Sequence, residues 1–277
     1  MALTTIGLMA LLGCFTGFMA GLLGIGGGMI ITPFLIMLIP SSLIPHEHIV
    51  HVAIATSLAT IAFTSLSSVR AHHKRGAVLW NVVASVAPGI LVGAVVGAQI
   101  AGWLPTFWLS LIFAAFVGFS AFKMFLNKSP RPDRNLPGTI GKFFMGIAIG
   151  ILSALVGAGG GFISVPWMIW CNVKMQNAVA TSAAFGFPIA LFGTIGYIIS
   201  GWNVSGLPPW PIDLGYICIP ALFSVAITSV LFAPLGAKVA HSIDTKPLKK
   251  IFACLLCFVC PYMIRPVSYT HLRAHET

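Results

Sequence analysis

Long apolar stretches with almost no charged residue constrain this chain more than any other feature of its sequence. Residues 78–101 and 104–126 are two examples, and each is long enough to cross roughly 30 Å of hydrocarbon as a helix. Only 7% of the 277 residues are charged, whereas a soluble domain carries about 25%. Membrane-spanning strands would alternate polar and apolar residues over about ten positions, and no such alternation occurs. The sequence therefore predicts an all-α polytopic membrane protein in the cell membrane.

The formal net charge of +10 has an explanation that does not involve nucleic acid. The basic residues lie in short connections between apolar segments, which is where a membrane protein needs them for its orientation. No basic face or stacking platform accompanies them, so we expect no nucleic-acid partner. The six cysteines lie within apolar segments, and His46 and His48 lack the spacing of a helical zinc site. We expect neither a metal ion nor a cofactor.

An internal repeat divides the sequence into two related halves. Residues 17–33 match residues 150–166, and both segments contain three consecutive glycines followed by a proline, Pro33 or Pro166. Three further matches follow in the same order: 53–57 with 178–182, 97–101 with 236–240, and 112–114 with 251–253. Four collinear matches indicate a duplicated unit.

Each half is predicted to contain a glycine-broken first segment followed by three ordinary helices. The first repeat covers 1–126, a cytoplasmic linker covers 127–140, and the second repeat covers 141–264. Residues 265–277 are polar and rich in histidine, and we interpret them as a non-native tail. The expected segments are 5–39 (broken near 24–28), 50–69, 78–101, 105–126, 141–172 (broken near 157–161), 177–200, 214–235 and 248–264.

The placement of Lys and Arg predicts that the two repeats have opposite orientations. Basic residues follow the second helix of the first repeat, at 70–75, and occur again in the linker. The corresponding loop of the second repeat, 201–212, has none. All basic connections share one cytoplasmic side only if the repeats are inverted. Each glycine-broken segment must then be a hairpin that returns to its own side, and the short arm 162–172 favours re-entry over a full crossing.

These residues carry a resemblance to a known family. The paired Gly-Ile-Gly-Gly-Gly and Gly-Ala-Gly-Gly-Gly breaks, the prolines after them, and the Ala-Thr-Ser openings of the next helices resemble the TauE/SafE sulfite exporter family over residues 1–264. The resemblance implies a multi-pass permease for sulfite, an organosulfonate or a related small anion, and it suggests export. Members differ in their substrates, so the resemblance indicates the class of protein better than its cargo.

The glycine breaks also predict an anion site by physical reasoning alone. Consecutive glycines let the backbone approach a ligand closely and expose N–H groups. A helix that resumes after the break points its N-terminus at the tip, where it attracts anions. The alternative is that the glycines only permit close helix packing, and that the hydroxyls bond a carbonyl one turn back. The candidate substrate-binding residues are Gly26, Gly27, Gly28, Gly159, Gly160, Gly161, Thr56, Ser57, Thr181 and Ser182.

His51 lies five residues before Thr56 and is a candidate for proton coupling, because a histidine changes charge near neutral pH. The sequence lacks the ATP-binding, dinucleotide-binding and hydrolase motifs, so we expect a transporter rather than an enzyme. Three alternatives stay open: an anion channel, an intramembrane enzyme that uses Cys171 or His51, and an assembly factor for partner helices. The expected partners are a small anion and the lipid bilayer, and a homo-oligomer is left open.

Overall fold

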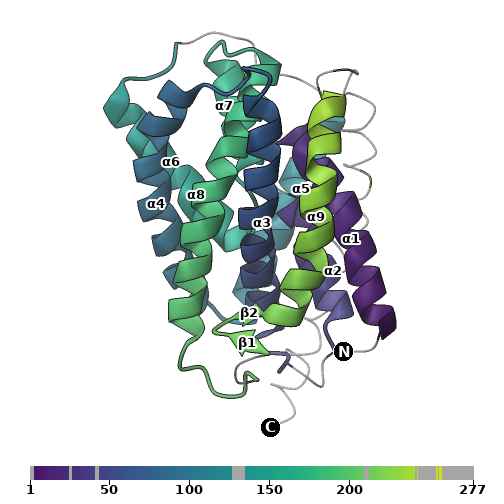
Figure 1. The fold of residues 1–277 in the computed structure, drawn as a ribbon. Helices are drawn as coiled ribbons and strands as arrows, with labels where there is room; N and C mark the ends of the chain where they lie inside the picture. Colours follow the sequence, from purple (N-terminus) through teal and green to yellow (C-terminus); the bar gives the residue numbers. More distant parts are fainter. Residues whose placement is uncertain are drawn as a thin grey trace.

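The computed structural model describes residues 3–24, 27–40, 44–126, 135–208, 212–240, 242, 254, 256 and 257. Within this part of the chain the structure is helical apart from one short β-hairpin (Figure 1). The elements are α1 (Leu3–Leu23), α2 (Gly28–Leu38), α3 (Ile49–His73), α4 (Trp80–Trp103), α5 (Thr106–Leu126), α6 (Thr139–Val156), α7 (Gly161–Trp170), α8 (Met175–Gly201), β1 (Asp213–Leu214), β2 (Ile217–Cys218) and α9 (Ile219–Ala240).

Seven of the described helices are long and apolar enough to cross a membrane. The exceptions are α2 and α7, which have 11 and 10 residues and reach only about 15–17 Å. Large apolar side chains cover the outside of the bundle, where lipid would solvate them. Examples of these exposed side chains are Trp103, Trp108, Phe122, Phe223 and Leu231. The prediction of an all-α polytopic membrane protein is confirmed.

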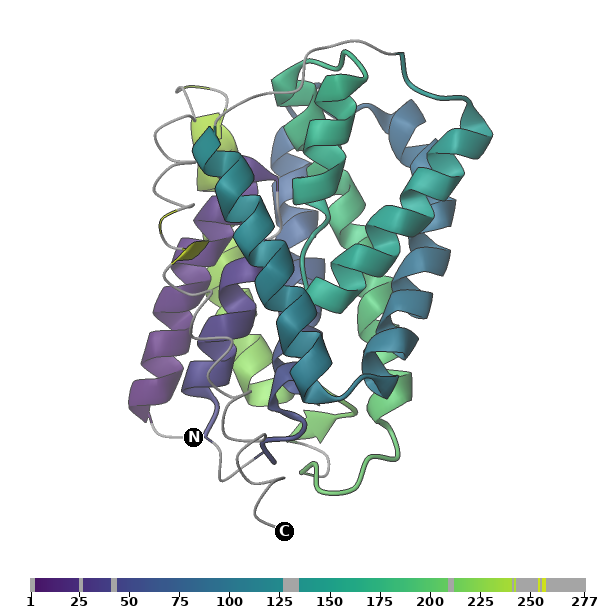
Figure 2. The ribbon, with the colours of Figure 1, turned by 180° about the vertical axis from the view of Figure 1, so that it is seen from behind.

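The two short helices belong to two hairpins that open at opposite ends of the bundle. The hairpin of α1 and α2 starts and finishes at the end marked N, whereas that of α6 and α7 starts and finishes at the other end (Figures 1 and 2). Between them α3 and α8 run side by side through the centre. The most enclosed of the seven spans is α3, so the side chains on its faces meet protein rather than lipid.

Small residues let helices from the two halves of the sequence pack backbone against backbone. The most extensive contacts are those of α1 with α9 and of α4 with α6. A Cβ atom on Gly17 would lie 2.2 Å from Ser229 O, and one on Gly89 would lie 2.0 Å from Phe143 O. Such close approach is a common way for helices to associate in lipid, where no hydrophobic driving force acts between them. The halves are therefore intertwined.

Charged residues separate between the two ends of the bundle. Glu47 and Asp213, the acidic residues in the described part of the chain, lie at the end where α3 and α9 begin. The basic residues lie at the opposite end, and an excess of Lys and Arg is typical of the cytoplasmic side. The described basic residues are Arg70, Lys74, Arg75, Lys123, Lys142, Lys174 and Lys238.

The expected helix over 214–235 is wrong at its start. Residues Asp213 to Cys218 form an antiparallel hairpin, and α9 begins only at Ile219 and continues to Ala240. Gly215 has φ +60° in the turn, a conformation that suits glycine and would break a helix. Most of the expected helix over 248–264, and all of the tail 265–277, lie outside the described residues.

Candidate functional site

The two glycine breaks have the same backbone conformation. Gly27 precedes α2 with φ 72° and ψ −10°, and Gly160 precedes α7 with φ 76° and ψ −11°. Gly24 and Gly157, three residues earlier in each break, have φ 67° and 63°. Side chains other than glycine rarely adopt these left-handed values, so the breaks are alike in geometry as well as in sequence. Gly26 lies outside the described residues.

The tips of the two hairpins meet inside the bundle. A Cβ atom on Gly28 would lie only 1.9 Å from Gly157 O, so the two backbones touch there. Ser57 of α3 stabilises this contact, because its hydroxyl lies 3.2 Å from Gly157 O and 3.4 Å from Gly28 O. The serine of the first Thr-Ser pair therefore bridges both hairpins.

The serine of the second Thr-Ser pair, Ser182, contacts the tip of the first hairpin. Ser182 Oγ donates to Gly24 O at 3.1 Å. Ser164 of α7 lies next to it, with its Oγ 2.8 Å from Ser182 Oγ and 3.0 Å from Gly160 O. Each Thr-Ser serine therefore bonds the hairpin tip of the opposite half.

The two threonines serve a different purpose. Thr56 Oγ1 accepts the backbone N–H of Cys218 at 3.0 Å, and Thr181 Oγ1 accepts that of Leu79 at 3.0 Å. Cys218 and Leu79 stand directly before α9 and α4. The threonines thus anchor helix starts, and in each hydroxyl the oxygen is already used as an acceptor.

Two buried hydroxyls at the tips have no hydrogen-bond partner within the described structure. They are the hydroxyls of Thr32 and Ser153. A Cβ atom added to Gly157 would lie 3.1 Å from Thr32 Oγ1, and a Cβ atom added to Gly160 would lie 3.3 Å from Ser153 Oγ. Both side chains are essentially unexposed. A buried hydroxyl is normally hydrogen-bonded, so these two groups are available to a ligand. Ser153 was not among the residues selected from the sequence.

The remaining predicted glycines lie close to the same region. Gly161 is the first residue of α7, and Gly159 O lies 3.7 Å from the position of a Cβ on Gly186 of α8. The first turn of α7 closes with the Ile163 and Ser164 N–H groups bonded to Gly160 O, and α2 closes in the same way on Gly27 O. Both helix N-termini therefore start at the tips, where their dipoles favour negative charge.

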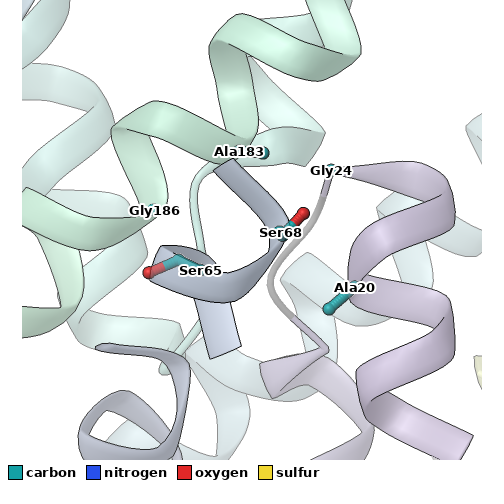
Figure 3. A pocket seen from close by; sticks show the side chains of 6 residues that line it. All are labelled: Ala20, Gly24, Ser65, Ser68, Ala183 and Gly186. Carbon is teal, nitrogen blue, oxygen red and sulfur yellow. The ribbon is translucent and has the colours of Figure 1, made fainter. Parts of the chain in front are cut away.

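A small pocket lies beside the first tip, between α1, α3 and α8 (Figure 3). It has room for about one water molecule. Its two polar side chains, Ser65 and Ser68, were missed by sequence reasoning. With Ser57 they recur at helical spacing on α3, and that periodicity was the available signal. The lining residues are Ala20, Gly24, Ser65, Ser68, Ala183 and Gly186.

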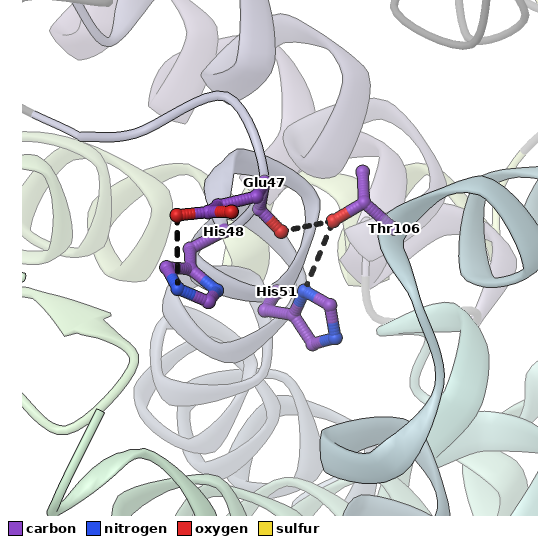
Figure 4. Close-up of polar contacts among 4 residues, drawn as sticks. All are labelled: Glu47, His48, His51 and Thr106. Carbon is purple, nitrogen blue, oxygen red and sulfur yellow. Dashed lines mark hydrogen bonds and ion pairs between the residues drawn. The ribbon is translucent and has the colours of Figure 1, made fainter. Parts of the chain in front are cut away.

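His51 contacts a different part of the fold from the tips (Figure 4). Its Nε2 lies 3.0 Å from both Ala101 O and Leu104 O, at the turn between α4 and α5. Its ring stacks on Tyr216 with centroids 5.1 Å apart. Six residues separate it from Ser57, or about 9 Å along a helix. The structure therefore does not bring His51 to the glycine tips.

The β-hairpin next to His51 contains a buried acid. Asp213 is only 4% exposed, and its backbone pairs with that of Cys218 across the hairpin. Burial raises the pKa of Asp213 to about 6, an effect that the nearby Cys218 thiol partly offsets. This carboxyl lies outside the membrane-spanning helices, at the end away from the basic residues.

Comparisons with known proteins agree with this architecture. The sequence matches the family described as sulfite exporter TauE/SafE over residues 9–263. A probable membrane transporter protein of Haemophilus influenzae is 34% identical over 92% of this chain and 97% of its own length. Another, from Methanocaldococcus jannaschii, is 27% identical over 93% of this chain and 94% of its own. No solved structure matches the chain. By the extent of the family match, this multi-pass membrane protein belongs to the TauE/SafE family of membrane transporters.

Proposed function

We propose that this transporter carries a small sulfur-containing anion, sulfite or an organosulfonate, and that it exports this anion as a secondary carrier or facilitator. The observation that carries the proposal is the meeting of the two hairpin tips, Gly28 against Gly157, at the N-termini of two short helices. In the described part of the chain the charged side chains lie in loops or near helix ends. An anion at the tips would be held by helix dipoles and hydrogen-bond donors alone.

The proposed site lies between Gly27 and Gly28 of one hairpin and Gly160 and Gly161 of the other. The hydroxyls of Thr32 and Ser153, which have no partner among the residues that the structure describes, are its best available side-chain donors. Ser57 and Ser182 hold the tips in place through their bonds to glycine carbonyls. Proton coupling through His51 stays a prediction, and it would require coupling over a distance because His51 binds the α4–α5 turn.

We also infer that the chain consists of two inverted repeats, 1–126 and 141–264, joined by a cytoplasmic linker. The reciprocal contacts support this inference: Ser57 bonds Gly157 O while Ser182 bonds Gly24 O. The opposite openings of the two hairpins support it as well (Figure 2). Inverted repeats with broken helices are a recurrent transporter architecture, with the site where the breaks meet.

The test is substrate flux in proteoliposomes loaded in turn with sulfite, methanesulfonate, thiosulfate and sulfate. We expect saturable flux of at least one of the first two anions. Gly160→Val places a branched side chain at φ 76° and should abolish that flux while the protein still inserts, because insertion depends on the apolar spans. Gly7→Val is the matched control, since no atom of the described residues lies within 4 Å of its Cβ position.

Two outcomes would contradict the proposal. The substrate class is wrong if none of the four anions is carried by protein that is correctly inserted. The site is wrong if Gly160→Val carries the anion at the wild-type rate. Single-channel conductance far above carrier rates would instead identify an anion channel.

A further inference from the structure

The pocket beside Gly24 is lined by small side chains, whereas the matched positions in the other half of the described structure carry larger ones. The match of Ser57 with Ser182 pairs Leu58 with Ala183 and Ile61 with Gly186 along α3 and α8. Ala183 and Gly186 line the pocket. Leu58 and Ile61 instead fill the equivalent space with their larger side chains. A Cβ atom added to Gly193 would lie 3.1 Å from Leu58 Cδ1, and a Cβ atom added to Gly28 would lie 2.7 Å from Ile61 Cδ1. The opening is therefore one-sided.

Hydrogen bonds confirm that these positions correspond in space as well as in sequence. His72, at the end of α3, lies with its Nε2 3.1 Å from Gly21 O. Tyr197, its match on α8, donates through its hydroxyl to Ala154 O at 3.1 Å. Gly21 and Ala154 are themselves matched positions of α1 and α6. The difference between the two sides is therefore a difference in side chains, not in backbone arrangement.

Ser68 is the polar group whose position needs an explanation. Its side chain is 1% exposed, and its hydroxyl has no hydrogen-bond partner within the described structure. Figure 3 shows that hydroxyl directed toward Gly24. Ser65, one turn earlier, is 3% exposed and bonds Ala62 O at 3.2 Å. An unpartnered buried hydroxyl destabilises a fold, so a ligand atom that accepts its hydrogen bond would be favoured there.

We infer that Ser68 binds the transported anion, donating a hydrogen bond to one oxygen of a sulfite or sulfonate group in a subsite beside Gly24. This inference rests on the proposed function. The pocket accommodates about one water-sized atom, which is the size of a single oxyanion oxygen. Its lining contains no carboxylate that would repel an anion.

The subsite also lies on a defined side of the membrane. Ser65 and Ser68 precede the end of α3 that carries Arg70 and Lys74, the cytoplasmic end by its charge. Leu58 and Ile61 lie nearer the opposite end of the same helix. A subsite at this end of α3 would suit an exporter that loads its substrate from the cytoplasm.

The test compares Ser68→Ala with Ser67→Ala in proteoliposomes, with sulfite and methanesulfonate as probes. Ser67 is the matched control because its hydroxyl bonds Val230 O at 2.8 Å, away from the pocket. Ser68→Ala should raise KM about ten- to hundredfold, the effect of losing one hydrogen bond to a charged group. Its maximal rate and its melting temperature should stay within about twofold and a few degrees of wild type.

A second variant tests the pocket without touching Ser68. Ala183→Leu introduces the side chain found at the matched position of the other repeat, and it should fill the pocket and stop cytoplasmic loading. An unchanged KM in both Ser68→Ala and Ala183→Leu, with wild-type flux intact, would overturn the subsite and leave the proposed function standing. Absence of flux for every sulfur anion in the wild type would overturn both.

Discussion

The contact between the two hairpin tips predicts a large effect of one added methyl group. In Gly28→Ala the new Cβ atom would lie 1.9 Å from Gly157 O, whereas ordinary contacts begin near 3.4 Å. Because this nearest atom belongs to the backbone, the two tips must separate by roughly 1.5 Å. Overpacking of this kind typically costs 1–3 kcal/mol.

The same separation would also disturb Ser57, which bonds carbonyls on both sides of the contact. A lost hydrogen bond adds about 1 kcal/mol, so we expect Gly28→Ala to lower the free energy of unfolding by about 2–4 kcal/mol. Thermal unfolding in detergent measures this effect, and flux in proteoliposomes should fall with it. Because φ of Gly28 is not in the left-handed region, the effect would report packing rather than backbone strain.

Gly7→Ala is the control for this experiment. Gly7 lies in α1, and within the described part of the chain no atom lies within 4 Å of its Cβ position, so alanine should be neutral or slightly stabilising there. If Gly28→Ala unfolds at the same temperature as Gly7→Ala and transports normally, the hairpin tips do not touch as described.

Three further predictions follow from other contacts. Thr181→Val removes the acceptor of the Leu79 N–H and should lower stability by about 1–3 kcal/mol; an additional tenfold loss of sulfite binding would show that the hydroxyl also donates to the anion. The raised pKa of Asp213, about 6, means that the folded protein favours the protonated carboxyl. The contribution of this proton to the free energy of unfolding is complete below pH 4 and is lost as pH rises through 6. The wild type should therefore be about 1 kcal/mol more stable at pH 5 than at pH 7, and thermal melts of Asp213→Asn should lack that difference. Single cysteines in segments 70–75 (the end of α3 and the turn after it) and 201–212, in a protein without native cysteines, should react with an impermeant reagent from opposite sides; reaction from one side would mean parallel repeats.

The glycine breaks were predictable from sequence because their requirement is local. Three consecutive glycines before a short apolar segment can hardly continue a helix, and the structure begins α2 and α7 at Gly28 and Gly161. The hairpin at Asp213–Cys218 was missed because its residues continue an apolar run that resembles the start of a helix. Contact with α3, where Thr56 accepts the Cys218 N–H, stabilises the hairpin instead.

The roles of the polar side chains could not be predicted in the same way. Ser57 and Thr56 are neighbours in sequence, yet one bonds a hairpin tip 100 residues away and the other bonds the start of α9, 162 residues away. Ser68 looked like an ordinary helix serine, and only the packing of α1 and α8 around it buries its hydroxyl with no partner among the described residues.

The sequence by itself determined that this chain crosses a membrane, where its helices break, and which end carries the positive charge. Lipid imposes these features locally, through the length of each apolar span and the placement of Lys and Arg. The tertiary structure alone decided which helices pair, which hydroxyls tie the tips together, and on which side a pocket stays open. Those outcomes depend on small residues that meet from opposite halves of the chain, such as Gly28 and Gly157, and no local pattern specifies their partners.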